Sequence, residues 1–221
     1  MTRRLLLCFL LLAGLALAAY PRLLRSQSHR AAKAATAQVA PRLRDGDLIF
    51  HTSLSAQSQA IQLATHSPWS HCGILYRQGQ NWLVFEAVQP VKLTPLADWV
   101  ARGRGGHFVT KRLRDADTAL TPAALARLKA AGRPLLGHPY DLYFGWADDR
   151  IYCSELIWKV YERGLGRRLG QLQHLRDFDL THPAVQARLR ERYGRNLPLG
   201  ETVISPASIF GSPELVTVLR R

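Results

Sequence analysis

The chain has 221 residues, of which 47% are hydrophobic and 21% charged, with a formal net charge of +14. This length and balance exclude a disordered chain and a protein that spans a membrane throughout, and they suit one folded domain with a sizeable core. No nucleic-acid-binding pattern accompanies the basic charge, so we expect no nucleic-acid partner but an attraction to anionic envelope polymers or lipid headgroups, hence a peripheral membrane contact. A merely basic solvated surface is the alternative.

The first 19 residues are typical of an export segment. A short basic region contains Arg3 and Arg4, an uncharged run follows from 5 to 19, and residues 16–18 (ALA) have the small-x-small pattern of a cleavage site. An uncleaved anchor is the alternative, since Arg22 and Arg25 follow closely. In both cases we expect the folded part in the periplasm or cell envelope. The basic, Ala-rich stretch 20–44 predicts a linker or a loosely docked helix, and 45–221 the folded domain.

The pattern of the domain predicts an α+β fold. Hydrophobic periodicity and turn residues indicate the following elements in chain order: a strand over 47–51, a helix over 55–65, hairpin strands 71–77 and 81–87, a short helix over 95–100, a strand over 107–111, helices over 121–131, 151–164 and 183–193, and a closing strand over 215–219.

Cys153 lies in the first turn of the predicted helix 151–164. Asp148 and Asp149 precede this helix in the sequence and are candidates to cap its N-terminus. The helix dipole and the free N–H groups there favour the thiolate, which is the form that attacks a carbonyl carbon. A buried, inert thiol is one alternative, because Cys often packs as a small hydrophobe. A disulfide with Cys72 is another, in an oxidising compartment. The sequence around Cys153 argues against the disulfide, whereas its position alone is equally compatible with a buried inert thiol and with a reactive one.

A thiolate hydrolase needs a base that is oriented by a third group. If the hairpin turn is Gln78-Gly79, the strands pair so that His71 lies directly opposite Glu86, with Cβ atoms ~5 Å apart on one face. The carboxylate would then fix the imidazole tautomer and stabilise its cation. A shift of one residue would place Ala87 opposite His71 and remove this argument. Taken singly, each could be an ordinary strand histidine or a solvated carboxylate.

Other candidate ligands form no site pattern. His66, His71 and Cys72 match no common zinc spacing, and the Gly-rich run 103–106 lacks the strand-then-helix context of a phosphate loop. We therefore expect no metal and no cofactor.

Five motifs together resemble the permuted NlpC-type, papain-like cysteine amidases of the YiiX/YebB sort. They are GDLIF (46–50), SPWSHCGI (67–74), VFEA (84–87), YD (140–141) and YCSEL (152–156). In this branch the His strand precedes the Cys helix, and triads keep their roles in any chain order. The resemblance implies a papain-like fold with an antiparallel curled sheet against the Cys153 helix. It also implies Cys153 as nucleophile, His71 as base and then acid, Glu86 as the orienting residue and Tyr140 as oxyanion or substrate support.

These motifs predict an exported cysteine peptidase or amidase that cleaves an amide bond through a thioester, with peptidoglycan peptides as the first substrate hypothesis. A lipid acyl hydrolase or acyltransferase on the same fold is the first alternative. A broad apolar groove beside Cys153 would favour lipid, and a narrow polar cleft would favour peptide. A non-catalytic envelope binding protein is the second alternative, and the retained Cys153, His71 and Glu86 argue against it.

Overall fold

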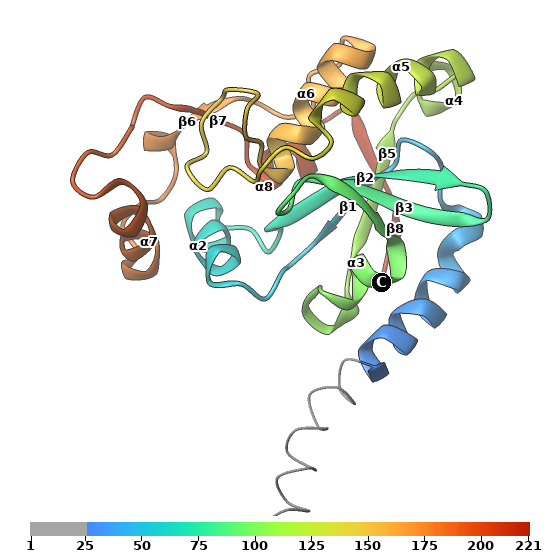
Figure 1. Ribbon diagram of the computed structural model, residues 1–221, viewed down its shortest axis with the longest axis horizontal. Coiled ribbons are helices and arrows are strands. Elements are labelled where there is room, and N and C mark those ends of the chain that lie inside the picture. The colour runs from blue at the N-terminus through green and yellow to red at the C-terminus, as the bar shows by residue number, and fades with distance from the viewer. Residues whose placement is uncertain (1–25) are drawn as a thin grey trace, which may run out of the picture.

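The computed structural model (Figure 1) describes residues 26–221, so the predicted export segment lies outside the described residues. Within the part of the chain that is described, no helix has both the length and the apolar character needed to cross a bilayer.

A six-stranded antiparallel sheet forms the centre of the domain, in the order β4-β3-β2-β1-β5-β8. A two-stranded ribbon, β6-β7, lies apart from it. The strands are β1 (Leu48–His51), β2 (His71–Gln78), β3 (Asn81–Glu86), β4 (Lys92–Pro95), β5 (Val109–Leu113), β6 (Gln173–His174), β7 (Thr202–Val203) and β8 (Leu215–Arg220). The α+β architecture predicted from the sequence is confirmed.

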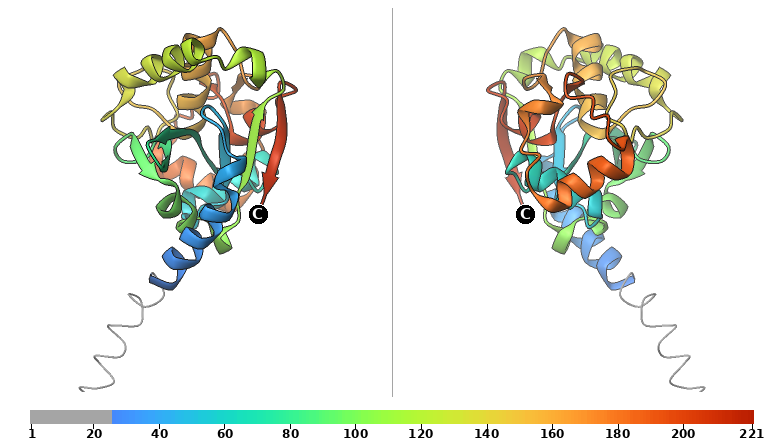
Figure 2. Two further views of the ribbon diagram at one scale, coloured as in Figure 1. Left: turned by 90° about the vertical axis from the view of Figure 1, so that its right-hand side faces the viewer. Right: turned by 90° about the vertical axis from the view of Figure 1, so that its left-hand side faces the viewer.

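Helices cover both faces of the sheet and one of its ends (Figures 1 and 2). They are α2 (Ala56–Thr65), α3 (Leu96–Ala101), α4 (Ala116–Ala119), α5 (Pro122–Gly132), α6 (Cys153–Leu165), α7 (Pro183–Tyr193) and α8 (Pro206–Phe210). Helix α6 packs on β2 and against α5, while α3 lies on the opposite face and α2 contacts α7. The predicted α2, α3, α5, α6 and α7 are present within two residues of their expected bounds; β4, β6, β7, α4 and α8 were not predicted.

Strand alternation divides the buried side chains into two cores. Phe50, Cys72 and Ile74 point toward α6 and join the larger core, whereas Ile49 and Leu75 point toward α3 and join the smaller one. The α6 side chains Leu156, Ile157, Val160 and Tyr161 are completely buried in the larger core. Full burial of one such aliphatic side chain contributes about 1.5–3 kcal/mol, so this face fixes α6, and therefore its first residue, against the sheet.

The predicted hairpin register is wrong by two residues. The turn is Gly79-Gln80, with Gly79 at φ 59°, and Gln78 pairs with Asn81 and Ile74 with Phe85. Continued to the strand end, this register sets Glu86 opposite Gly73 rather than opposite His71. Because side chains alternate with a period of two, the shift keeps His71 and Glu86 on one face. They are diagonal neighbours, not direct partners.

Residues 26–39, which were predicted as part of a linker, form a helix. Ala32, Ala35 and Val39 are buried on it, and Ala32 and Val39 belong to the smaller core with Trp99. The helical alternative is therefore the correct one from residue 26 onward. The Ala-rich composition, which suggested a linker, supplies small side chains that let this helix lie close to the sheet.

Candidate active site

Cys153 is the first residue of α6, and its side chain is 2% exposed. The helix begins two residues later than predicted, with Tyr152 at the N-cap, and the backbone N–H of Tyr152 donates to the Glu155 carboxylate at 3.2 Å. The capping expected from Asp148 and Asp149 is absent. Cys153 thus lies at the positive end of the helix dipole, as its position in the sequence predicts.

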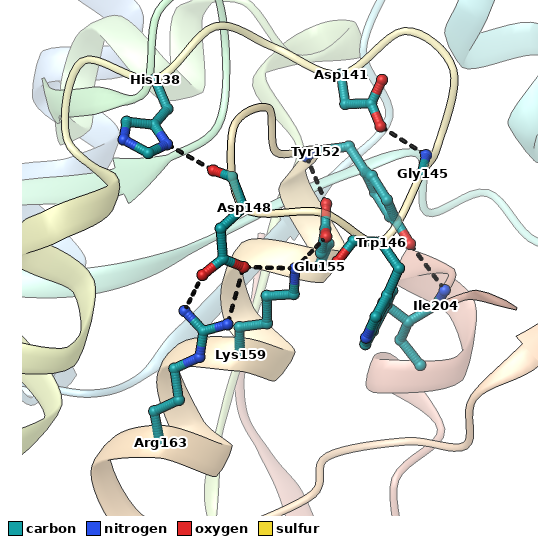
Figure 3. A network of polar contacts seen from close by, with 10 residues as sticks. All are labelled: His138, Asp141, Gly145, Trp146, Asp148, Tyr152, Glu155, Lys159, Arg163 and Ile204. Atoms are coloured by element: carbon teal, nitrogen blue, oxygen red, sulfur yellow. Dashed lines mark hydrogen bonds and ion pairs between the residues drawn. The ribbon is translucent and has the colours of Figure 1, made fainter.

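The loop before α6 is also tied to the helix by charged contacts (Figure 3). The Lys159 ammonium lies 2.8 Å from the Asp148 carboxylate and 2.7 Å from that of Glu155, and Arg163 also binds Asp148. At the helix start, the Tyr152 hydroxyl accepts a hydrogen bond from the Ile204 N–H at 3.0 Å. These contacts hold the Cys153 backbone in place from both sides.

His71 and Glu86 meet as a buried pair on the α3 face of the sheet. The His71 Nε2 lies 2.6 Å from a Glu86 carboxylate oxygen, and Glu86 is fully buried. Thr94 donates its hydroxyl to the other carboxylate oxygen at 2.5 Å, and Arg102 donates to the same oxygen. The His71–Glu86 contact expected from the hairpin is therefore present, although the register that would produce it is different.

The thiol of Cys153 lies within hydrogen-bonding reach of both His71 and Cys72. Burial disfavours the imidazolium, but hydrogen bonds with Cys153 and Glu86 outweigh it and raise the pKa of His71 to about 9. Hydrogen bonds from Cys72 and His71 lower the pKa of Cys153 well below that of a free thiol, against the effect of its burial. For Glu86, His71 and Arg102 outweigh burial and lower the pKa to about 2. Together these shifts favour a thiolate–imidazolium pair beside a carboxylate.

Cys72 follows His71 but points to the opposite face, toward α6. It is fully buried, and both cysteines are free thiols. Burial and the neighbouring Cys153 raise the pKa of Cys72 well above its usual value. Cys72 therefore stays protonated and donates its S–H to the Cys153 sulfur. Apart from the adjacency of Cys72 to His71, no signal in the sequence indicates this contact.

Two hollows border the active site, one lined by Cys153 and the other by His71. We name the first the apolar chamber: it touches Cys153, is open to solvent, has about 700 Å³ of free space when the solvent at its mouth is included, and is lined by Ile61, Ala64, Phe178, Leu180 and Leu189 among others. We name the second the His71 cleft: it contains His71, Tyr140, Ser70, Gln89 and Arg102. The predicted Tyr140 thus lies in the cleft beside His71, and Gln57 borders both hollows.

Sequence reasoning missed the groups that surround His71 and Glu86. His51, the partner of His71 in β1, stacks on Trp99 with ring centroids 3.8 Å apart. Burial, and then the charge of His71, lower the pKa of His51 well below its usual value, so a neutral ring lies against the imidazolium. Thr94 and Arg102 come from a strand and a loop that carry no local motif. Only the three-dimensional arrangement identifies them.

The described residues contain no group of three or more His, Cys, Asp or Glu side chains placed to hold a metal ion.

Comparison with known proteins identifies the family. Residues 42–219 match the family model described as permuted papain-like amidase enzyme, YaeF/YiiX, C92 family. The chain is 50% identical over 175 residues to the uncharacterized protein YiiX of Escherichia coli K12, covering 79% of this chain and 85% of that protein. A crystal structure described as metalloprotein yiiX from Escherichia coli O157:H7 superposes with a TM-score of 0.78 at 49% identity, over 81% of this chain and 98% of the other. The chain belongs to the C92 family of permuted papain-like amidase enzymes, and it is a cysteine peptidase or amidase-type hydrolase.

Proposed function

We propose that the enzyme cleaves an amide bond through a thioester on Cys153. The observation that carries this proposal is the continuous contact from Cys153 at the start of α6 to His71 and on to the buried Glu86. The thiolate attacks the carbonyl carbon, and the His71 imidazolium gives its proton to the leaving amine. His71 then takes a proton from water, which attacks the thioester and releases the acid. Glu86 orients and stabilises the imidazolium throughout, and Tyr140 and the Cys153 N–H are the proposed donors to the oxyanion.

Two reagents test this chemistry without the natural substrate. Iodoacetamide reads the reactivity of the thiolate, and p-nitrophenyl acetate reads attack on a carbonyl. We expect both reactions to occur at Cys153 at neutral pH, to vanish in Cys153→Ala, and to slow by about 10²-fold in His71→Ala. Cys72→Ser is the control for the site of labelling. Alkylation no faster than that of a free thiol, or labelling of Cys72, would contradict the proposal.

The hollow beside Cys153 supports an apolar acyl group on the substrate. Its walls are predominantly aliphatic and aromatic, with Arg188 and Arg192 at its border, whereas a narrow polar cleft was the feature expected for a peptidoglycan peptide. This favours the second candidate function, a lipid acyl hydrolase or acyltransferase, in which the acyl chain enters the apolar chamber and the leaving group lies in the His71 cleft. The same thioester serves both, since water or another nucleophile can receive the acyl group.

A chain-length series tests the second candidate. Each additional buried CH₂ contributes about 0.8 kcal/mol, so kcat/KM should rise several-fold per carbon from p-nitrophenyl acetate toward octanoate. Ala64→Trp, which fills the chamber, should abolish that rise while acetate still reacts; Ala37→Trp, on the exposed side of helix 26–39, is the control. A preference for acetate in the wild-type enzyme would favour the peptide substrate instead.

We further propose that the enzyme works in the periplasm or cell envelope, on a peptide or acyl substrate found there. The basic, apolar and small-residue pattern of residues 1–19 supports this, and the positive net charge supports a peripheral contact with an anionic membrane. Fractionation of cells that express the full chain, with mass measurement of its N-terminus, tests both export and cleavage. Recovery in the cytoplasm would contradict the proposal.

The related protein from Escherichia coli O157:H7 is called a metalloprotein. Among the described residues of this chain, no three His, Cys, Asp or Glu side chains are grouped so that they could hold a metal ion, and the proposed reaction uses only Cys153, His71, Glu86 and Tyr140.

A further inference from the structure

Three polar side chains form a hydrogen-bonded row beside the active site. The Arg192 guanidinium on α7 donates to the Gln57 Oε1 on α2 at 3.0 Å, and the Gln57 Nε2 donates to the Tyr140 hydroxyl oxygen, also at 3.0 Å. Arg192 is itself held over the Phe144 ring, 5.3 Å from its centroid. The row thus runs from the mouth of the apolar chamber to the His71 cleft.

The donor pattern fixes the direction of each hydrogen bond. A guanidinium can only donate, so the carbonyl oxygen of Gln57 must face Arg192 and its NH₂ group must face Tyr140. The Tyr140 oxygen therefore accepts. A phenol hydrogen lies in the ring plane on one of two sides, and the Gln57 NH₂ repels it from one of them. The Tyr140 hydrogen is consequently left on the other side, free to donate.

Tyr140 is placed where such a donor is useful. Its backbone is anchored by a bond from its N–H to the Gln89 side chain at 2.7 Å and by a bridge to Ile151, two residues before Cys153. Its side chain lines the His71 cleft. Burial and the nearby Cys153 raise the pKa of Tyr140 well above its usual value, so the hydroxyl keeps its proton.

We propose that Gln57, itself oriented by Arg192, is a positioning residue that turns the Tyr140 hydroxyl hydrogen toward the carbonyl oxygen of a substrate attacked by Cys153. This inference rests on the proposed function, because it assumes acylation of Cys153.

Gln57→Glu tests the inference with little change of shape. A carboxylate still pairs with Arg192 but can only accept, so Tyr140 must donate to it and loses the hydrogen that it would give to the oxyanion. Loss of one oxyanion donor costs about 10²-fold, so acylation by p-nitrophenyl acetate should fall by up to that factor, as in Tyr140→Phe. Alkylation by iodoacetamide forms no oxyanion, and its rate should stay within about two-fold of wild type. The exposed Gln59→Glu on the same helix is the matched control.

The double variant Gln57→Glu/Tyr140→Phe should acylate no more slowly than Tyr140→Phe alone, since Gln57 acts only through Tyr140. The neutral Gln57→Met keeps the test valid if Gln57→Glu does not fold. Acylation at the wild-type rate in both Gln57 variants, additive losses in the double variant, or parallel loss of alkylation would each overturn the inference. Failure of the proposed function would instead show in the wild-type enzyme, as a thiol that iodoacetamide and the ester leave unmodified.

Discussion

At the scale of single residues, the charge of Glu86 is the centre of the arrangement around His71. Both of its carboxylate oxygens have hydrogen-bond partners: one binds His71, and the other accepts from Thr94 and Arg102. A buried carboxylate with so many donors remains ionised, and it stabilises the imidazolium that the thiolate in turn requires. The contact from Glu86 to His71 could be predicted from the sequence. Its support by Thr94 and Arg102 could not, because both come from segments without a local signal.

Glu86→Gln should make the thiol less reactive at low pH. Without the carboxylate the pKa of His71 falls from about 9, so His71 is protonated less often. Because the positive charge of His71 stabilises the thiolate, the pKa of Cys153 then rises. Because a neighbouring opposite charge shifts a pKa by about 1–3 units, the acid limb of the pH profile of iodoacetamide alkylation should move up by about one unit or more. Glu162→Gln, on α6 away from the site, should leave the profile in place. An unmoved acid limb in Glu86→Gln would show that the carboxylate does not control the pair.

The proton held by His71 and Cys153 predicts an unusual dependence of stability on pH. The pKa of His71 is higher in the folded protein than its ordinary value of 6.5. Its protonation therefore contributes stability that is fully present below pH 6.5 and is lost as the pH rises to about 9. The pKa of Cys153 is lower in the folded protein than the ordinary thiol value of 9.0. Its ionisation therefore contributes stability that grows as the pH rises toward 9.0, opposite in sign to the contribution of His71. In this range the folded pair and the unfolded pair each bind one proton, so the two slopes cancel.

Urea unfolding at several pH values checks this cancellation. The wild-type free energy of unfolding should gain no slope from this pair between pH 6.5 and 9. In Cys153→Ala the thiolate no longer compensates, so the His71 proton held by Glu86 alone should give a stability that falls as the pH rises above 6.5. Parallel profiles for the two proteins would mean that no thiolate–imidazolium pair forms.

At the scale of elements, the β2–β3 hairpin shows what sequence can and cannot determine. The strands and their shared face follow from the alternation of apolar side chains, which has a period of two. The register depends on which two residues make the turn, and Gln78-Gly79 and Gly79-Gln80 are equally compatible with one glycine at positive φ. The two possible turns give registers that differ by two residues, and a shift of two residues leaves every side chain on the same face of the sheet. His71 and Glu86 therefore remain on one face and in contact although the predicted register is wrong.

Gly73 is the residue that lets His71 and Glu86 meet diagonally. A Cβ there would lie 2.4 Å from the Val84 Cγ1 and 2.9 Å from the Phe85 carbonyl oxygen. Gly73→Ala should therefore push β3 away and lower the free energy of unfolding by about 1–3 kcal/mol, as overpacking does. It should also slow alkylation of Cys153, because the His71–Glu86 bond lengthens. Gly200→Ala, where a Cβ meets no atom within 4 Å, is the control, and an equal effect in both variants would contradict this explanation.

At the scale of the whole molecule, the sequence predicted the elements that carry strong periodicity and missed those that depend on distant partners. Helix α6 was predicted because its apolar face is continuous over Leu156, Ile157, Val160 and Tyr161. The apolar chamber lies between α2, α7 and the start of α6, whose relative placement no local pattern encodes. For the same reason helix 26–39 was predicted only as an alternative to a linker: small alanines produce a weak signal until the surface that covers them is known.

The packing of helix 26–39 predicts that two of its alanines respond differently to the same substitution. Ala32 is 4% exposed and joins the smaller core, whereas Ala34 faces solvent. Ala32→Asp buries a carboxylate without a partner and should lower the free energy of unfolding by about 2 kcal/mol or more. Ala34→Asp makes the same chemical change, with the same cost in helix propensity, and should change it by less than about 0.5 kcal/mol. Equal urea midpoints for the two variants would show that this helix is the linker that its composition suggests. A clear difference would make it a structural part of the domain, because its apolar side packs in the smaller core with Ile49 and Leu75 of the sheet and Trp99 of α3.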